Sequence, residues 1–262
     1  MGFLSRWLGG GDVAGKPAVR RGHASASLPD GMRVYAIGDI HGRYDLLMRL
    51  EQRIREDLGE RPVPRALTIY LGDFVDRGPD SRRVVEYLRT AGGDGIERLF
   101  LRGNHEETLL EYLSDPQLIL SWKKFGGLET LFSYGVDVRD LMRGEGVEKA
   151  HAAFSASFPN EHLDFMEKLP PILSIGDYCF VHAGVKPGVP IDRQRPADLL
   201  WIREEFLHHE GSFGKVVVHG HTPTDTPTHL PNRINVDTGA YLTGKLTAAV
   251  LEGEDVAFIS VT

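Results

Sequence analysis

Short apolar runs, each ending in a polar turn that contains glycine, set the pattern of this chain. Near-continuous runs of this kind are typical of strands that are covered on both faces of a sheet. Helical periodicity follows each of the first three runs. The sequence therefore predicts strands at Arg33–Ile37, Leu67–Leu71, Arg98–Leu101, Tyr178–Val181, Val216–Val218 and Arg233–Val236, and helices at Tyr44–Leu58, Ser81–Thr90 and Glu106–Leu113.

The order of these elements indicates the fold class. Strands that alternate with helices predict parallel pairing through helical crossovers. The last two apolar runs, Lys245–Leu251 and Val256–Val261, follow each other directly, and we expect them to pair antiparallel. A two-sheet sandwich flanked by helices accommodates both halves. The predicted class is α/β with mixed sheets, and the helix-rich segment Asp115–Leu169 is predicted to form a cap or side layer.

The first thirty residues differ in composition from the rest. Gly9–Asp30 is rich in glycine, alanine and serine and contains Pro17 and Pro29, which is typical of a tail or linker. The folded part is expected to begin at Met32. Because no internal repeat or further low-complexity run follows, we predict a flexible tail over residues 1–30 and a single domain over residues 31–262.

Composition excludes several classes of protein. The 262 residues are 41% hydrophobic and 26% charged, which is ordinary for a globular protein. Cys179 is the single cysteine, so no intramolecular disulfide can form, and a reducing compartment, the cytoplasm, is predicted. The net charge of −7 argues against a nucleic-acid-binding face, which is normally basic.

No stretch approaches the ~20 consecutive apolar residues that a membrane-spanning helix needs. The apolar run within Met1–Leu8 is too short for a signal peptide and has no small-residue cleavage site. A loose or weakly docked tail is the favoured interpretation. A membrane or partner contact is the alternative, because four apolar side chains can share one helical face. They are Phe3, Leu4, Trp7 and Leu8.

The candidate chemistry follows the predicted strands. Five strand ends lead into short polar motifs that contain aspartate, asparagine or histidine beside glycine. In open α/β sheets, ligand sites assemble at the carboxyl ends of strands, and glycine there allows a close approach to the ligand. Asp39 and His41 are two residues apart, so in an extended segment both would point the same way. The motifs are Gly38–Gly42, Gly72–Gly78, Gly103–Glu106, His182–Gly184 and His219–Thr222.

Taken singly, each of these motifs is more often an ordinary turn than a ligand site. Together they supply six candidate metal ligands, one of them an aspartate able to bridge two ions. Imidazole, carboxylate and amide ligands without cysteine suit manganese, iron or zinc rather than a structural zinc site. Two ions roughly 3.5–4 Å apart form the usual clamp for in-line displacement at phosphorus.

The five motifs, in this order, resemble the phosphoprotein phosphatase (PPP) family of serine/threonine phosphatases. This family lies within the calcineurin-like metallophosphoesterase superfamily, and its compact bacterial and phage branch, the lambda phosphatase-like enzymes, is the nearest match. The similarity runs from about Val34 to Leu251 and includes Leu200–Glu204 and Val236–Ala240. Asp115–Ser174 matches no functional motif.

The resemblance implies a dinuclear metal centre, with manganese favoured and iron or zinc as alternatives. Asp39 and His41 would hold the first ion. Asp73 would bridge both ions. The second ion would be held by Asn104, His182 and His221.

It also implies that His105 is the general acid and that Asp76 holds its ring. Arg77 and Arg203 would bind the phosphoryl oxygens. Each assignment has an alternative. Asp76 and Arg77 could cap the following helix or pair with each other, and Arg203, in a helix-like run, could pair with a neighbouring glutamate. His219 is interpreted as a strand-end histidine rather than a ligand.

The implied activity is hydrolysis of phosphate monoesters in phosphoserine and phosphothreonine proteins or peptides, with phosphotyrosine also considered. A symmetric dinucleoside tetraphosphate hydrolase is the main alternative, because it shares the first and third motifs. In that family the position of Asp76 is typically not acidic, whereas Gly72–Gly78 here has the full acidic form. A non-catalytic scaffold is disfavoured, because all six ligand positions and the His–Asp pair are intact.

Overall fold

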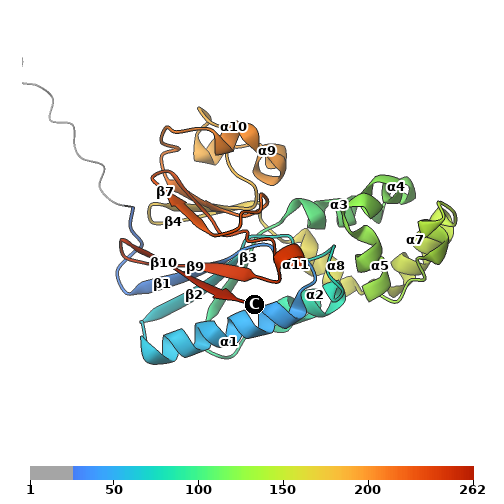
Figure 1. Cartoon of the computed structure of the whole chain (residues 1–262), viewed down its shortest axis with the longest axis horizontal. Helices are drawn as coiled ribbons and strands as arrows, with labels where there is room; N and C mark the ends of the chain where they lie inside the picture. The colour runs from blue at the N-terminus through green and yellow to red at the C-terminus, as the bar shows by residue number, and fades with distance from the viewer. Residues whose placement is uncertain (1–25) are drawn as a thin grey trace, which may run out of the picture.

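Two five-stranded sheets pack face to face in the computed structural model, which describes residues 26–262 (Figure 1). The first sheet has the order β10-β9-β1-β2-β3. Strands β1, β2 and β3 are parallel, whereas β9 runs antiparallel to both β1 and β10. These strands span Met32–Ile37 (β1), Arg65–Tyr70 (β2), Glu97–Phe100 (β3), Leu246–Glu252 (β9) and Asp255–Val261 (β10).

The second sheet has the order β4-β5-β6-β8-β7. Its central strands β5, β6 and β8 are parallel, and the edge strands β4 and β7 pair antiparallel with β5 and β8. Its strands span Ile172–Ile175 (β4), Tyr178–Val181 (β5), Val216–His219 (β6), Thr228–Leu230 (β7) and Arg233–Asn235 (β8).

Successive side chains along each strand point to opposite faces of the sheet, and this divides the core into layers. In β1, Val34 faces the other sheet, whereas Tyr35 packs against the helices on the outer face. In β5, Phe180 lies between the sheets, whereas Cys179 packs under the helices of the opposite face. Both sheets are therefore covered on both sides, which explains the near-continuous apolar runs of the sequence.

Helices α1 and α2 cover the outer face of the first sheet, and α9 and α10 cover that of the second (Figure 1). The predicted helices are confirmed as α1 (Tyr44–Glu60), α2 (Ser81–Thr90) and α3 (Asn104–Tyr112). Shorter helices in the C-terminal half are η3 (Ile191–Arg193), α9 (Pro196–Trp201), α10 (Glu204–Leu207) and α11 (Ala240–Thr243).

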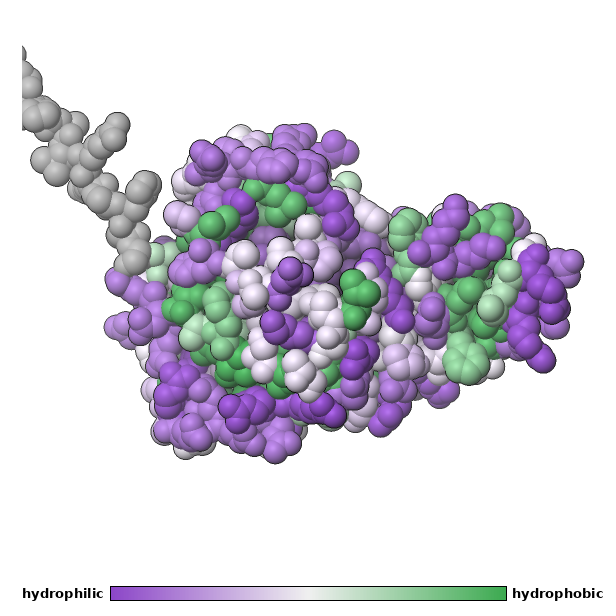
Figure 2. Space-filling view, in the orientation of Figure 1, coloured by the Kyte–Doolittle hydropathy of each residue, from purple (hydrophilic) through white to green (hydrophobic). Residues whose placement is uncertain are grey.

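The middle segment forms a helical cap that projects to one side of the sandwich (Figure 1). Figure 2 shows apolar surface over this cap, where Leu120, Phe125, Phe132 and Met142 are exposed. The cap comprises η1 (Pro116–Leu118), α4 (Ile119–Trp122), η2 (Lys123–Phe125), α5 (Gly127–Ser133), α6 (Arg139–Met142), α7 (Val147–Ser157) and α8 (Asn160–Glu167).

The structure confirms the α/β sandwich with mixed sheets and the antiparallel C-terminal pair, and it differs from the prediction in two respects. Strands β4 and β7, which are short edge strands, were not predicted. The helix-like run around Arg203 is two short helices, because Arg203 has φ −131° and ψ −95° and interrupts the helical backbone.

The chain is packed against the body from a few residues before Met32. Leu28 is buried, its N–H donates to the Gly253 carbonyl, and Ser27 bonds to Asp177. The interpretation of residues 1–25 as a tail lies outside the described residues, and the division into a tail and one domain stays a prediction. Across residues 26–262, no helix is both long and apolar enough to cross a membrane.

Candidate metal centre

The parallel strands deliver the predicted site residues to one place. Because parallel strands end at the same edge of a sheet, the loops after β1, β2 and β3 meet those after β5 and β6. Within residues 26–262, every non-glycine residue with a positive φ is a predicted site residue. Left-handed backbone is costly for such residues, at roughly 1–3 kcal/mol each, and is concentrated at functional sites. They are His41, Asp73, Asp76, Arg77 and His221.

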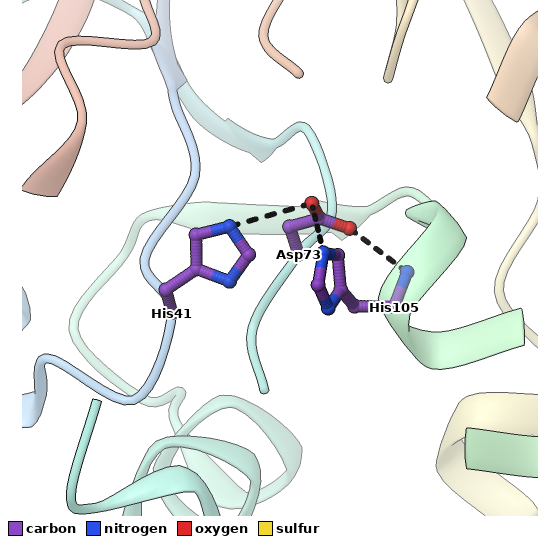
Figure 3. A group of neighbouring side chains, drawn as sticks. All are labelled: His41, Asp73 and His105. Atoms are coloured by element: carbon purple, nitrogen blue, oxygen red, sulfur yellow. Dashed lines mark hydrogen bonds and ion pairs between the residues drawn. The ribbon is translucent and has the colours of Figure 1, made fainter. Parts of the chain in front are cut away.

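Asp39 and His41 converge, although not as the sequence reading assumed. His41 has φ 46°, so the segment is a tight turn rather than an extended strand. Its Nε2 lies 4.0 Å from Asp39 Oδ2. The same nitrogen lies 3.5 Å from Asp73 Oδ2 (Figure 3). The Nδ1–H donates to the Val75 carbonyl at 2.8 Å, so Nε2 keeps its lone pair for an ion. Burial lowers the pKa of His41 to about 3, which keeps the ring neutral.

A second cluster forms around the other oxygen of Asp73. His182 Nε2 lies 3.4 Å from Asp73 Oδ1, 2.9 Å from Asn104 Oδ1 and 3.1 Å from His221 Nδ1. The Nδ1–H of His182 donates to the Leu71 carbonyl at 3.0 Å. Asp73 thus presents Oδ2 to one cluster and Oδ1 to the other, which is the placement that a bridging ligand needs.

These residues fit divalent metal ions. With Nδ1–H committed to Leu71, the lone pair of His182 Nε2 faces the Asp73 and Asn104 oxygens, so three acceptors converge. Burial lowers the pKa of His221 to about 2 and favours the neutral ring that a metal binds. Burial also disfavours the charged form of His182, but the nearby Asp73 carboxylate outweighs it and raises that pKa to about 9. A bound cation would balance the charge of the Asp73 carboxylate in place of the proton on His182.

His105 and Asp76 form the expected pair. His105 Nδ1 lies 2.6 Å from Asp76 Oδ2. Its Nε2 lies 3.7 Å from Asp73 Oδ2 (Figure 3). Burial opposes the charged ring, but Asp73 and Asp76 outweigh it and raise the pKa of His105. Nε2 also lies within reach of an ion between His41 and Asp73. Because Nδ1 is occupied by Asp76, the structure is compatible with a proton donor that faces the centre.

The cap contributes to this pair, which sequence reasoning missed. Asp76 is fully buried, and two cap side chains donate to its carboxylate: Trp122 Nε1 to Oδ2 at 2.6 Å and Thr130 Oγ1 to Oδ1 at 2.6 Å. Neither residue lies in a recognisable motif. Their side chains became informative only when the chain brought α4 and α5 against the loop after β2.

Glu106 was also missed as a site residue. Its buried carboxylate accepts four backbone N–H groups, from Asp73 at 2.8 Å, Phe74 at 2.7 Å, Val75 at 3.3 Å and Gly103 at 2.9 Å. Burial, with a contribution from the Asp73 charge, raises the pKa of Glu106 to about 7. The carboxylate therefore joins the loop that carries Asp73 to the start of α3. Its place directly after Gly103-Asn104-His105 was the available signal.

Arg77 lies at the centre, and Arg203 lies at its edge. Arg77 Nη2 is 3.3 Å from His105 Nε2, and its guanidinium stacks 4.5 Å above the ring of Tyr241. Arg203 is exposed and donates to Thr222 Oγ1 at 3.2 Å, one residue beyond His221. The phosphate-binding roles of both arginines stay predictions.

The alternative interpretations find little support. Asp80 occupies the N-cap position of helix α2, so neither Asp76 nor Arg77 caps it. No ion pair joins Asp76 to Arg77 within the described chain. The glutamates beside Arg203 pair with His208 and Lys186 instead. His219 is buried against Phe206, and its Nδ1 contacts the Gly220 carbonyl, as a strand-end histidine would.

The comparisons with known proteins agree with this geometry. The sequence model of the calcineurin-like phosphoesterase family matches residues 32–259. The chain is 28% identical over 228 residues to serine/threonine-protein phosphatase 1 of Salmonella typhimurium, covering 84% of this chain and 92% of that protein. It is also 28% identical over 233 residues to the asymmetrical bis(5'-nucleosyl)-tetraphosphatase PrpE of Bacillus subtilis, covering 80% and 87%.

Solved structures show the same fold. A crystal structure of a putative diadenosine tetraphosphatase superposes with a TM-score of 0.62 at 23% identity, covering 90% of this chain and 99% of that one. A cold-active protein-tyrosine phosphatase of a Shewanella species gives 0.54 at 16% identity, covering 90% and 83%. The chain belongs to the calcineurin-like phosphoesterase family and is a metal-dependent phosphoester hydrolase.

Proposed function

We propose that this enzyme removes phosphate from phosphoserine and phosphothreonine in proteins. The observation that carries the proposal is the buried His105–Asp76 pair at the centre, with Nδ1 and Oδ2 2.6 Å apart. A serine or threonine leaves as a strongly basic alkoxide, so its departure needs a proton donor. A nucleotide leaving from a dinucleoside polyphosphate is weakly basic and needs little protonation. Two further hydrogen bonds, from Trp122 and Thr130, hold the Asp76 side of the His105–Asp76 pair. A proton donor held in this way favours a phosphate ester of an alcohol as the substrate.

The residues of this chain have separable tasks in that reaction. When bound, two divalent cations would make a water molecule nucleophilic near neutral pH and would offset the phosphoryl charge. His105 holds the proton at Nε2 that the alkoxide receives. Asp76 accepts the Nδ1–H and keeps the ring in that orientation. Arg77 presents a guanidinium that is already held on the face of Tyr241. The ions would be held by Asp39, His41, Asp73, Asn104, His182 and His221.

Hydrolysis of dinucleoside tetraphosphates is the second candidate. It is favoured by the tetraphosphatase names of several relatives and of one similar structure. The relative named symmetrical, from Dechloromonas aromatica, is 30% identical over 164 residues but covers 63% of this chain and 48% of that protein. The phosphatase relative is matched over more of both chains than this symmetrical relative, but an asymmetrical tetraphosphatase of Halalkalibacterium halodurans is matched over 88% of this chain and 94% of that protein. Relatives therefore support both candidates, and the leaving-group argument favours the first.

The metal and the compartment belong to the same proposal. Manganese is the proposed ion, because imidazole and carboxylate ligands without cysteine suit it, with iron and zinc as alternatives. The cytoplasm is the proposed compartment, because the one cysteine is buried and unpaired. Elemental analysis of protein purified without added metal tests the first point.

The experiment compares leaving groups on manganese-reconstituted protein. We expect kcat/KM for phosphoserine or phosphothreonine peptides to exceed that for diadenosine tetraphosphate. His105→Asn should lower kcat on phosphopeptides by roughly 10²–10⁴-fold. It should have a much smaller effect on nitrophenyl phosphate and the tetraphosphate. His208→Asn, on the exposed surface, is the matched control. A preference for the tetraphosphate, or an equal loss on every substrate, would contradict the proposal.

A further inference from the structure

One parallel strand delivers a carboxylate that the described site does not use. Strands β1, β2, β3, β5 and β6 each end in a predicted ligand, and β8 is the remaining parallel strand. In the register between β6 and β8, His219 lies opposite Asn235. His221 and Asp237 each lie two residues beyond these partners. Asp237 therefore reaches the same edge of the sheet as the ligand His221.

Two glycines place Asp237 beside Asp39. A methyl group on Gly220 would lie 2.2 Å from Asp39 Oδ1 and 3.7 Å from Asp237 Cβ, so both aspartates border the same point. A methyl group on Gly38 would lie 3.3 Å from Asp237 Cα. The backbone of Asp237 thus packs directly against the strand end that carries Asp39.

The charge of Asp237 has no cationic partner in the described chain. The side chain is 3% exposed and accepts one hydrogen bond, from the Gly239 N–H at 2.8 Å. No ion pair with a lysine, arginine or histidine reaches it among residues 26–262. Clustered buried carboxylates are costly unless a cation lies among them.

The two ion positions are also unequally supplied. The second has Asp73 and three further protein ligands. The first has Asp73 with Asp39 and His41, because His105, which is also within reach, is assigned to proton donation. We propose that Asp237 belongs to the first metal site and strengthens the binding of its ion from the side of Asp39. This proposal depends on the metal centre and is independent of the substrate class.

The first test measures metal affinity. Metal-free protein is titrated with Mn²⁺, and the unbound ion is followed by electron paramagnetic resonance. Asp237→Asn preserves the shape and the Gly239 hydrogen bond but removes the charge. We expect one of the two ions to bind about 10–100-fold more weakly, the scale of a supporting carboxylate, and the other to be unchanged. Asp255→Asn, at the exposed start of β10, should leave both affinities unchanged.

The second test separates a metal role from a structural one. Without metal, Asp237→Asn relieves repulsion with Asp39, so the melting temperature should rise above that of the wild type. With saturating Mn²⁺ the order should reverse, because the wild type gains more from the ion. A lower melting temperature in both states indicates a structural role. That result, or Mn²⁺ affinities within twofold of wild type, would overturn the proposal, whichever substrate the enzyme prefers.

Discussion

Glu106→Gln should destabilise the protein before any metal is bound. The carboxylate accepts two backbone N–H groups on each oxygen: Phe74 and Val75 on Oε1, Asp73 and Gly103 on Oε2. A glutamine places an NH₂ group on one side, and either orientation leaves two buried N–H donors facing another donor. An unsatisfied buried group costs about 1–3 kcal/mol. We therefore expect the free energy of unfolding to fall by roughly 2–6 kcal/mol.

The assay is urea unfolding of metal-free protein, followed by circular dichroism, at about pH 9, which is above the Glu106 pKa of about 7 and keeps the carboxylate ionised. Glu107→Gln is the matched control, because its side chain is adjacent but pairs with Arg102 near the surface. A buried pocket that tolerated the amide would give a loss below about 0.5 kcal/mol, the range of ordinary surface substitutions. That result would refute the view that Glu106 holds the Asp73 loop through its two oxygens. We also expect weaker metal binding, because Asp73 lies on that loop.

Three further predictions address single contacts. Asp73→Asn should reduce the metal content below about two ions per chain and weaken binding at both metal positions, because each Asp73 oxygen faces a different cluster. Full activity of the wild type after thorough chelation would contradict the metal mechanism. Arg203→Ala should lower kcat/KM roughly ten- to a hundredfold without loss of metal, and Arg203→Lys should recover only part of the lost kcat/KM. A kcat/KM of Arg203→Ala within twofold of wild type would place Arg203 outside the phosphate site. Trp122→Phe removes a hydrogen bond to Asp76 and should lower kcat with unchanged metal content, and an unchanged kcat would show that Trp122 only packs.

The strand ends were the part of the site that sequence could predict. A buried strand followed by a short polar motif predicts both where the strand ends and which side chains lie at that end. Asp39, Asp73 and His182 therefore came together without any knowledge of the loops between them. The backbone of those loops was not predictable, and His41 was expected in an extended segment that the structure replaces with a left-handed turn.

The cap shows why other residues could not be found. Trp122 and Thr130 lie about fifty residues from Asp76 along the chain, so no local spacing links them. A tryptophan and a threonine in helices are typical of ordinary core residues, and nothing in the sequence indicates that these two contact Asp76. The same applies to the interruption at Arg203, where a favourable helical pattern gave way because the chain turns between α9 and α10. Tertiary contacts decided these features, and local preference is a weak guide to them.

The carboxylates of Asp39 and Asp73, which are predicted metal ligands, also accept backbone hydrogen bonds, and this affects how their variants are interpreted. Asp39 accepts the His221 N–H at 3.1 Å, and Asp73 Oδ1 accepts the His105 N–H at 3.1 Å. The first bond joins strand ends of the two sheets, and the second joins the ends of β2 and β3 within the first sheet. Both help to hold left-handed backbone, at His221 and Asp73, that is unfavourable by itself. Removing a ligand therefore removes a structural acceptor as well as a metal contact. Because neutral amides can still accept these bonds, asparagine variants separate the two effects, whereas alanine variants lose both at once.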